Sequence, residues 1–170
     1  MNHVTTLDWQ FALHGLGTVA VAGVLTGILG LERELARKAA GLRTHMLVGV
    51  AAAAFMLLGQ DAVSQYAEEQ PSHLLQADPV RVIQSIVLGI SVLGAGTIVH
   101  SGEGKVEGLT TAASVLLAAA IGIAVAIDQP LFAAALAVVV AVILFLLGLL
   151  ERWRDGGGPP GREDELQGSR

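Results

Sequence analysis

The sequence predicts an all-α, polytopic membrane protein with five transmembrane helices. Three observations support this fold class: the composition, five long apolar segments, and an uneven distribution of basic residues. Apolar residues make up 53% of the 170 residues and charged residues 15%, against roughly 45–50% and about 25% in typical soluble domains. The chain has no cysteine, and a net charge of −5 without a basic patch makes nucleic acid an unsuitable partner. A lipid bilayer is the expected environment.

Five apolar segments are long enough, or nearly so, to cross a bilayer as helices. A hydrocarbon core of about 30 Å requires about 20 mostly apolar residues, because backbone groups cannot remain unpaired in lipid. The segments are Phe11 to Leu31, Thr44 to Gly59, Val80 to Val99, Leu109 to Ile127, and Leu131 to Leu150. The first is not a cleavable signal peptide, because residues 1–10 contain no Lys or Arg. The second is short and is expected to recruit Leu42, Arg43 and Gln60.

The third segment is preceded by Asp78 and Pro79, which suit the N-cap and the first position of a helix. Before it, Asp61 to Ala77 is expected to form a short interfacial piece. After the fifth segment, Trp153 fits an anchor at headgroup level. Residues 1–152 are therefore expected to form the membrane domain, and residues 153–170 a flexible cytoplasmic tail rich in Gly and Pro.

Basic residues fall on one side of the predicted topology. Nine of the ten Lys and Arg residues lie in the 32–43 turn, the 101–108 turn or the C-terminal tail, whereas Arg81 lies on the other side. The positive-inside rule then places the N-terminus outside and the C-terminus in the cytoplasm. The outer side carries an excess of carboxylates. Such a surface could collect divalent cations, although exclusion of basic residues from exported loops explains it equally well.

A shift of 67 residues aligns the first two apolar segments with the next two. Nine of the 27 positions from Gly27 to Ala53 are then identical, and the pattern Lys-x-x-Gly-Leu-x-Thr begins at both Lys38 and Lys105. We expect two hairpins related as parallel repeats, with the fifth helix outside the pair. Chance similarity between two Gly-rich turns is the alternative.

Candidate functional residues gather at the two predicted inner turns and at the outer start of the third segment. They are Glu32, Arg33, Glu34, Lys38, Gly41, Arg43, Thr44, His45, Asp78, Arg81, Gln84, Lys105, Gly108, Thr110 and Thr111. Gly41 is expected to end the first helix in a left-handed conformation, and Thr44 to cap the next. No helix carries a charge at its centre, which argues against an ion relay. The weaker polar groups in the helices, Ser114 among them, are expected to form structural hydrogen bonds.

Small residues at helical spacing predict where helices approach closely. The candidates are Gly23, Gly27, Gly30, Gly89, Gly94 and Gly96, and the spacing continues through Ser114, Ala118, Gly122 and Ala126. For a metal, Asp78 is the best candidate ligand, although its N-cap role suffices to explain it. A Mg²⁺ site there would need a second carboxylate such as Asp61 or Asp128.

Several of these motifs together resemble the MgtC/SapB family of bacterial membrane proteins. The resemblance covers about Gly23 to Ala126, through GLERE at 30–34, KAAGLRTH at 38–45, DPxR at 78–81, LGAG at 93–96 and GLTTAA at 108–113. It implies a multi-pass protein of the bacterial cytoplasmic (inner) membrane, linked to magnesium homeostasis and, in pathogens, to virulence. It also implies a membrane regulator, with ATP synthase as one proposed target, and no enzymatic reaction.

Two departures from the family affect what the resemblance implies. Some members carry a cytoplasmic C-terminal domain that is absent from this sequence, and some have Asn where this chain has Thr110. The favoured function is a non-enzymatic regulator that acts through protein contacts in the bilayer, as a homo-oligomer packed at Gly23 and Gly27. No cofactor is expected, with Mg²⁺ left open. The alternatives are a divalent-cation (magnesium) transporter or channel, and an inner site at Lys38 and Lys105 for an anion or lipid headgroup.

Overall fold

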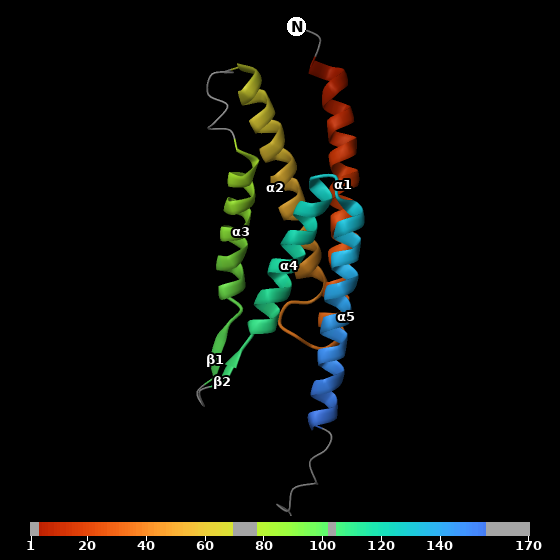
Figure 1. The fold of residues 1–170 in the computed structure, drawn as a ribbon, viewed down its shortest axis with the longest axis vertical. Helices are drawn as coiled ribbons and strands as arrows, with labels where there is room; N and C mark the ends of the chain where they lie inside the picture. The colour runs from red at the N-terminus through yellow and green to blue at the C-terminus, as the bar shows by residue number, and fades with distance from the viewer. Residues whose placement is uncertain (1–3, 70–77, 102–104, 156–170) are drawn as a thin grey trace, which may run out of the picture.

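The computed structural model describes residues 4–69, 78–101 and 105–155 of the chain. It contains five helices and one two-stranded sheet in this part of the chain: α1 (Val4–Leu35), α2 (Leu42–Glu69), α3 (Pro79–Ala95), β1 (Val99–Ser101), β2 (Lys105–Glu107), α4 (Leu109–Ala126) and α5 (Pro130–Asp155). The helices run alternately down and up the long axis, so the start of α1 and the end of α5 lie at opposite ends of the bundle (Figure 1).

Four helices contain segments that are long and apolar enough to cross a membrane. They are Phe11–Leu35, Leu42–Gln65, Leu109–Ala126 and Pro130–Leu150. The chain is therefore a multi-pass α-helical membrane protein by length and composition. α3 has 17 residues, which at 1.5 Å per residue is about 25 Å, short of the hydrocarbon core. The fifth crossing and the orientation of the termini stay predictions.

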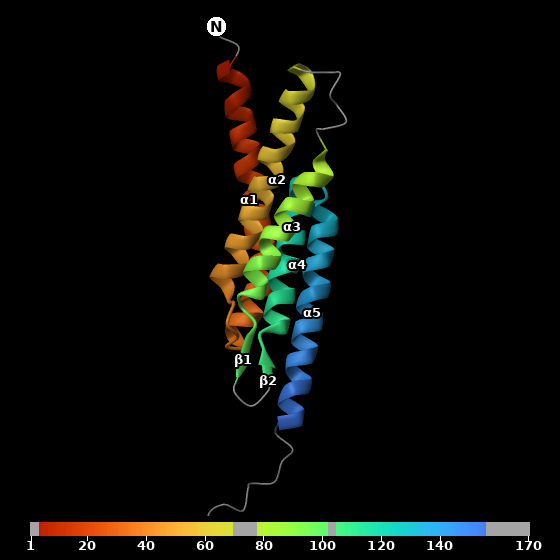
Figure 2. The same cartoon turned by 90° about the vertical axis from the view of Figure 1, so that its left-hand side faces the viewer.

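The third helix ends earlier than its hydropathy predicts. α3 stops at Ala95 rather than at Val99, because Val99–Ser101 pairs antiparallel with Lys105–Glu107 in the register Val99 to Glu107. This pairing is a non-local interaction that an apolar run does not reveal. The turn between the third and fourth helices is thus a β-hairpin, whereas the turn between the first and second has no described strand (Figure 2).

Two helices are longer than expected. α2 continues to Glu69, so the first part of the expected interfacial piece is helix, and residues 70–77 lie outside the described residues. α5 continues to Asp155, three residues into the expected flexible tail. The rest of that tail also lies outside the described residues.

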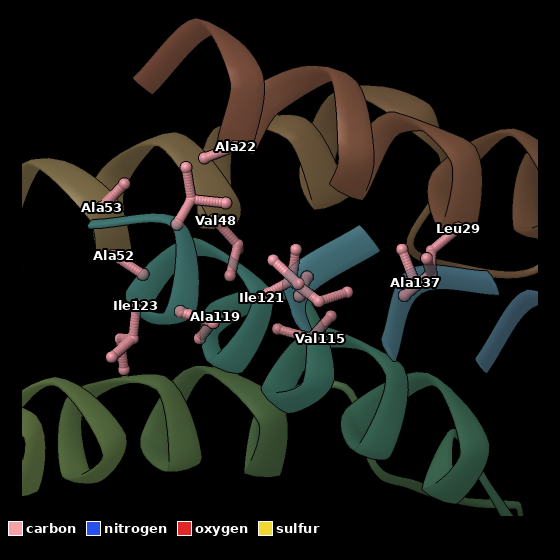
Figure 3. Packing of buried hydrophobic residues seen from close by; sticks show 14 of the residues in the cluster. Ala22, Leu29, Val48, Ala52, Ala53, Val115, Ala119, Ile121, Ile123 and Ala137 are labelled. Atoms are coloured by element: carbon pink, nitrogen blue, oxygen red, sulfur yellow. The ribbon is translucent and has the colours of Figure 1, made fainter. Parts of the chain in front are cut away.

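α4 occupies the centre of the bundle and packs against α1, α2, α3 and α5. Figure 3 shows its side chains, Val115, Ala119 and Ile121 among them, pointing into a core shared with the neighbouring helices. α5 packs on α1 and α4. The pairs α1–α2 and α3–α4 run in the same directions, as two parallel repeats would, although a duplication stays a prediction.

Candidate functional site

Four polar side chains from three helices meet near the end of the bundle that holds the α1–α2 turn. Arg33 lies near the end of α1, His45 in the first turn of α2, and Thr111 and Ser114 in the first turns of α4. Their exposed fractions are 4%, 0%, 3% and 1% respectively. We call these four residues the polar cluster. They come together because the central helix α4 packs against both helices of the first hairpin.

Arg33 links α1 to α4 within the polar cluster. Its Nη2 donates a hydrogen bond of 2.9 Å to the hydroxyl of Thr111, 78 residues further along the chain. A buried charge is tolerated in a protein only when hydrogen bonds compensate its desolvation. The Thr111 hydroxyl is therefore part of what allows a guanidinium to be placed between these two helices.

His45 links α2 to α4 through both of its ring nitrogens. Nδ1 lies 2.9 Å from the carbonyl oxygen of Gly41 and Nε2 lies 3.0 Å from Ser114 Oγ. Because a carbonyl oxygen can only accept, Nδ1 carries a proton, and in a neutral ring Nε2 must then accept from the Ser114 hydroxyl. The same hydroxyl lies 2.9 Å from the carbonyl oxygen of Thr111. One hydroxyl proton therefore serves two alternative acceptors, which couples the ring to the first turns of α4.

The α1–α2 turn is closed by residues other than those predicted. Arg37, with φ of 54°, adopts the left-handed conformation that was expected of Gly41. The bonds from Lys38 N to Arg33 O and from Arg37 N to Glu34 O form a Schellman motif at the end of α1. Gly41 does not have positive φ. The prediction that Gly41 ends the first helix was therefore wrong. Arg37, a non-glycine residue, adopts the left-handed conformation four residues earlier.

The first turn of α2 is capped from α1. The backbone amide of Leu42 donates a hydrogen bond of 2.8 Å to Glu34 Oε2, and a carboxylate at a helix N-terminus is favourable electrostatically. Thr44 lies inside α2, so its predicted capping role was wrong. Gly41 instead permits a close approach, since an added Cβ would lie 2.8 Å from Glu34 Oε2.

The predicted packing glycines have different surroundings. An added Cβ at Gly23 would lie 3.1 Å from Val50, at Gly27 3.3 Å from Met46, and at Gly30 2.7 Å from the backbone of Leu42, all on α2. These three positions face the chain's own second helix and are buried there. The prediction that Gly23 and Gly27 contact another copy of the chain was therefore wrong. The remaining glycines belong to α3 and its end. Gly94 faces Ala112 of α4 at 3.6 Å, Gly96 follows the last residue of α3, and Gly89 has no neighbouring atom within 4 Å among the described residues.

Two further glycines, Gly49 and Gly122, lie where α2 crosses α4. An added Cβ at Gly49 would overlap the side chain of Thr26 on α1, and one at Gly122 would overlap the carbonyl oxygen of Gly49. Gly122 continues the small-residue spacing of Ser114 and Ala118, which is a weak signal in so Ala-rich a chain. Gly49 has only Ala53 at the same spacing. The sequence therefore indicated close packing at Gly122, and it gave little reason to select Gly49.

The remaining candidates at the inner turns do not join the polar cluster. Lys38, Arg43 and Thr110 are exposed, Thr44 is half-buried, and Lys105 begins β2. Gly108 precedes α4 with φ of 90°, and none of the described side chains caps this helix. Glu32 is half-buried near Gly148 of α5, and its Oε2 has no hydrogen-bond partner among the described residues.

At the other end of the bundle, Asp78 caps α3. Its Oδ1 accepts a hydrogen bond of 2.8 Å from the amide of Val80, which confirms the predicted N-cap. Arg81 and Gln84 are exposed on the same helix. Asp61 Oδ2 accepts from Gln65 Nε2 at 2.7 Å, and Asp128 follows α4 with φ of 58°. Within the described ranges, no three His, Asp or Glu side chains are placed to hold a metal ion together, so Mg²⁺ at Asp78 stays a prediction.

The fold and the polar cluster define a multi-pass α-helical membrane protein in which an arginine and a histidine tie the first hairpin to a central helix. No solved structure matches this chain significantly. The chain belongs to the MgtC family, whose model matches residues 19–153. This confirms the resemblance found in the sequence motifs.

Three curated relatives illustrate the relationship. Protein MgtC of Brucella abortus is 38% identical over 117 residues, which cover 68% of this chain and 43% of the relative. YhiD of Escherichia coli K12, whose name describes a candidate magnesium transporter, is 36% identical over 105 residues, or 62% and 47% of the two chains. Protein SapB of Bacillus subtilis is 29% identical over 118 residues, or 69% and 50%. The chain spans about half the length of the curated relatives it matches.

Proposed function

We propose that this chain contributes to magnesium homeostasis as a non-enzymatic regulator in the bacterial cytoplasmic membrane, acting through protein contacts within the bilayer. Membership of the MgtC family and the magnesium-related name of YhiD support the link to magnesium. Because the chain spans about half of its relatives, the proposal concerns the membrane region that it shares with them. In this proposal the N-terminus is outside, and the polar cluster lies near the cytoplasmic face.

The observation that carries the proposal is the backbone contact between α2 and α4. Where Gly122 of α4 crosses Gly49 of α2, even one methyl group added at Gly122 would overlap the carbonyl oxygen of Gly49. An ion path needs a lining of polar groups and room for a partly hydrated ion, and this crossing leaves no such room. The packed crossing therefore favours a regulator over a pore between these helices.

The charge of the polar cluster supports the same conclusion. A guanidinium at 4% exposure stands between α1 and α4, and a fixed positive charge raises the barrier for a cation that approaches it. The His45 ring bonds to Ser114 and to the carbonyl oxygen of Gly41, the Ser114 hydroxyl also bonds to the carbonyl oxygen of Thr111, and the Thr111 hydroxyl accepts from Arg33. They are thus suited to holding helices in register.

The competing function is a magnesium transporter or channel, which the name of YhiD favours. Purified protein in liposomes that contain a magnesium-sensitive dye would separate the two functions. We expect the wild-type chain to restore growth of a deletion strain at low magnesium and to give no Mg²⁺ influx above that of empty liposomes. Influx that is lost in Asp78→Asn would refute the regulator and establish transport.

The partner of the regulator would be a membrane complex, and ATP synthase is the first to test. Cross-linking in membranes followed by purification should recover that complex with the wild-type chain and less of it with Thr111→Val, which disturbs the polar cluster. Thr110→Val is the matched control, because its side chain is exposed beside Thr111. Equal recovery with all three chains would exclude ATP synthase as a partner that depends on this cluster.

A further inference from the structure

We propose that α3 pairs in parallel with α3 of a second copy of this chain, across a groove beside Gly89. The inference rests on the proposed function, because it names one of the contacts within the bilayer. We call the exposed residues Arg81, Ser85, Leu88 and Val92 the α3 seam. Their spacing of four, three and four residues places them on one side of the helix, as in a helix-pairing interface.

The groove beside the seam is open and apolar. It has a volume of about 330 Å³ and lies between α2 and α3. Its lining residues are Phe55, Val82, Ser85, Ile86, Gly89 and Ile90. An added Cβ at Gly89 meets no described atom within 4 Å, whereas those at Gly23 and Gly27 meet α2 within 3.3 Å. Within the described residues, Gly89 is thus a small residue against which no other helix packs, and Ser85, one turn before it, is exposed.

The side chains next to the groove suit the same groove in another copy. Leu88 is 68% exposed and Val92 is 69% exposed. In lipid, helices associate by close packing rather than by hydrophobic burial, and a small residue facing a large one gives such packing. Insertion of Leu88 beside Gly89 of the second copy, and the reciprocal contact, would fill both grooves.

The polar groups of α3 select a second copy over a lipid chain or an unrelated helix. Copies in one membrane share an orientation, so a two-fold axis along the membrane normal brings the seam side of one α3 against the seam side of the other.

Charge complementarity acts at the outer end of the same face. Asp78 and Arg81 are both exposed and lie one turn apart. Asp78 Oδ1 accepts from the amide of Val80, which leaves Oδ2 able to accept from Arg81 of the second copy. Two parallel helices therefore form this opposite-charge pair twice, once on each side of the axis. An acyl chain offers no such charge match.

Cysteine cross-linking in native membranes tests the pair, because the chain has no cysteine of its own. Leu88→Cys should form a disulfide-linked dimer on oxidation. The matched control is Val138→Cys, which lies on α5 and is also exposed, at 58%. We expect at least a five-fold larger dimer fraction for Leu88→Cys than for Val138→Cys.

A second variant tests the groove. Gly89→Leu in the Leu88→Cys background should reduce the dimer fraction at least five-fold, because the added side chain occupies the space of the second copy. Gly17→Leu is the matched control, since an added Cβ at Gly17 on α1 also meets no described atom within 4 Å. It should leave the dimer fraction unchanged.

Three results would overturn the pair: equal cross-linking at Leu88 and Val138, no effect of Gly89→Leu, or native mass spectra showing monomers with a lipid that Gly89→Leu displaces. Growth at low magnesium and Mg²⁺ influx are measured separately on the same variants. They report on the proposed function, so Mg²⁺ influx through a cross-linked dimer would reject the regulator and leave the pair intact.

Discussion

Substitution of Gly122 by alanine tests the packed centre of the bundle most directly. The new Cβ would overlap the carbonyl oxygen of Gly49 and lie 3.2 Å from Ala52 Cβ. A backbone oxygen inside α2 cannot rotate away as a flexible side chain can. α2 and α4 must therefore separate to accept one methyl group.

The size of the effect follows from two opposing contributions. Overpacking a close-packed core typically costs about 1–3 kcal/mol, and replacing Gly by Ala inside a helix gains roughly 0.5–1 kcal/mol. Gly17→Ala should give the same gain without the overlap, because nothing lies within 4 Å of an added Cβ there. The difference between the two variants isolates the overlap, at about 1–3 kcal/mol in the free energy of unfolding.

The comparison can be made in detergent micelles by titration with SDS, with thermal aggregation as an independent measure. We expect Gly122→Ala to unfold at lower SDS and lower temperature than Gly17→Ala, with an unfolding equilibrium constant about 5- to 150-fold larger. If Gly122→Ala proves at least as stable as Gly17→Ala, the backbones of α2 and α4 are not in contact. The main argument against a pore between them then fails.

Three further substitutions test individual hydrogen bonds by the same unfolding measurement. Thr111→Val removes the acceptor of a buried guanidinium and should cost about 1–3 kcal/mol, whereas Thr110→Val, at an exposed position, should cost much less; equal losses would refute the role of the polar cluster. Glu34→Ala removes the acceptor of the Leu42 amide and should cost roughly 0.5–1.5 kcal/mol. Glu34→Gln keeps an acceptor oxygen and should lose less stability than Glu34→Ala; an equal loss in both variants would contradict the capping role. Asp78→Ala should cost about 1 kcal/mol and Asp78→Asn far less; a large loss in both would show that the charge, rather than the cap, matters.

Much of the fold could be predicted from local features of the sequence. The five apolar segments coincide with five helices, and Asp78 with Pro79 begins α3 as their cap chemistry requires. Element ends were less predictable where distant residues decide them. The pairing of Val99 with Glu107 ends the third helix early, and Arg37 adopts the left-handed conformation only because the turn around it is bonded that way.

The polar cluster could be predicted only in part. Arg33, His45 and Thr111 were among the candidates because they belong to dense polar motifs at two turns, but nothing in their spacing joined them. Their contact depends on α4 lying at the centre of the bundle. Ser114 was expected only as one of several weak polar groups, because a lone serine on an apolar helix carries no motif.

The two copies of Lys-x-x-Gly-Leu-x-Thr show why sequence symmetry predicts topology better than it predicts a site. Both copies precede a helix, but the helix after Gly41 is capped by Glu34, while the equivalent position before Gly108 is Ser101, in a strand. Only Gly108 has positive φ, and an added Cβ there would overlap the carbonyl oxygen of Thr97. The second helix of one hairpin is central and that of the other is not, so equivalent residues face different neighbours. The site therefore arises from the unequal burial of α2 and α4, which no repeat in the sequence encodes.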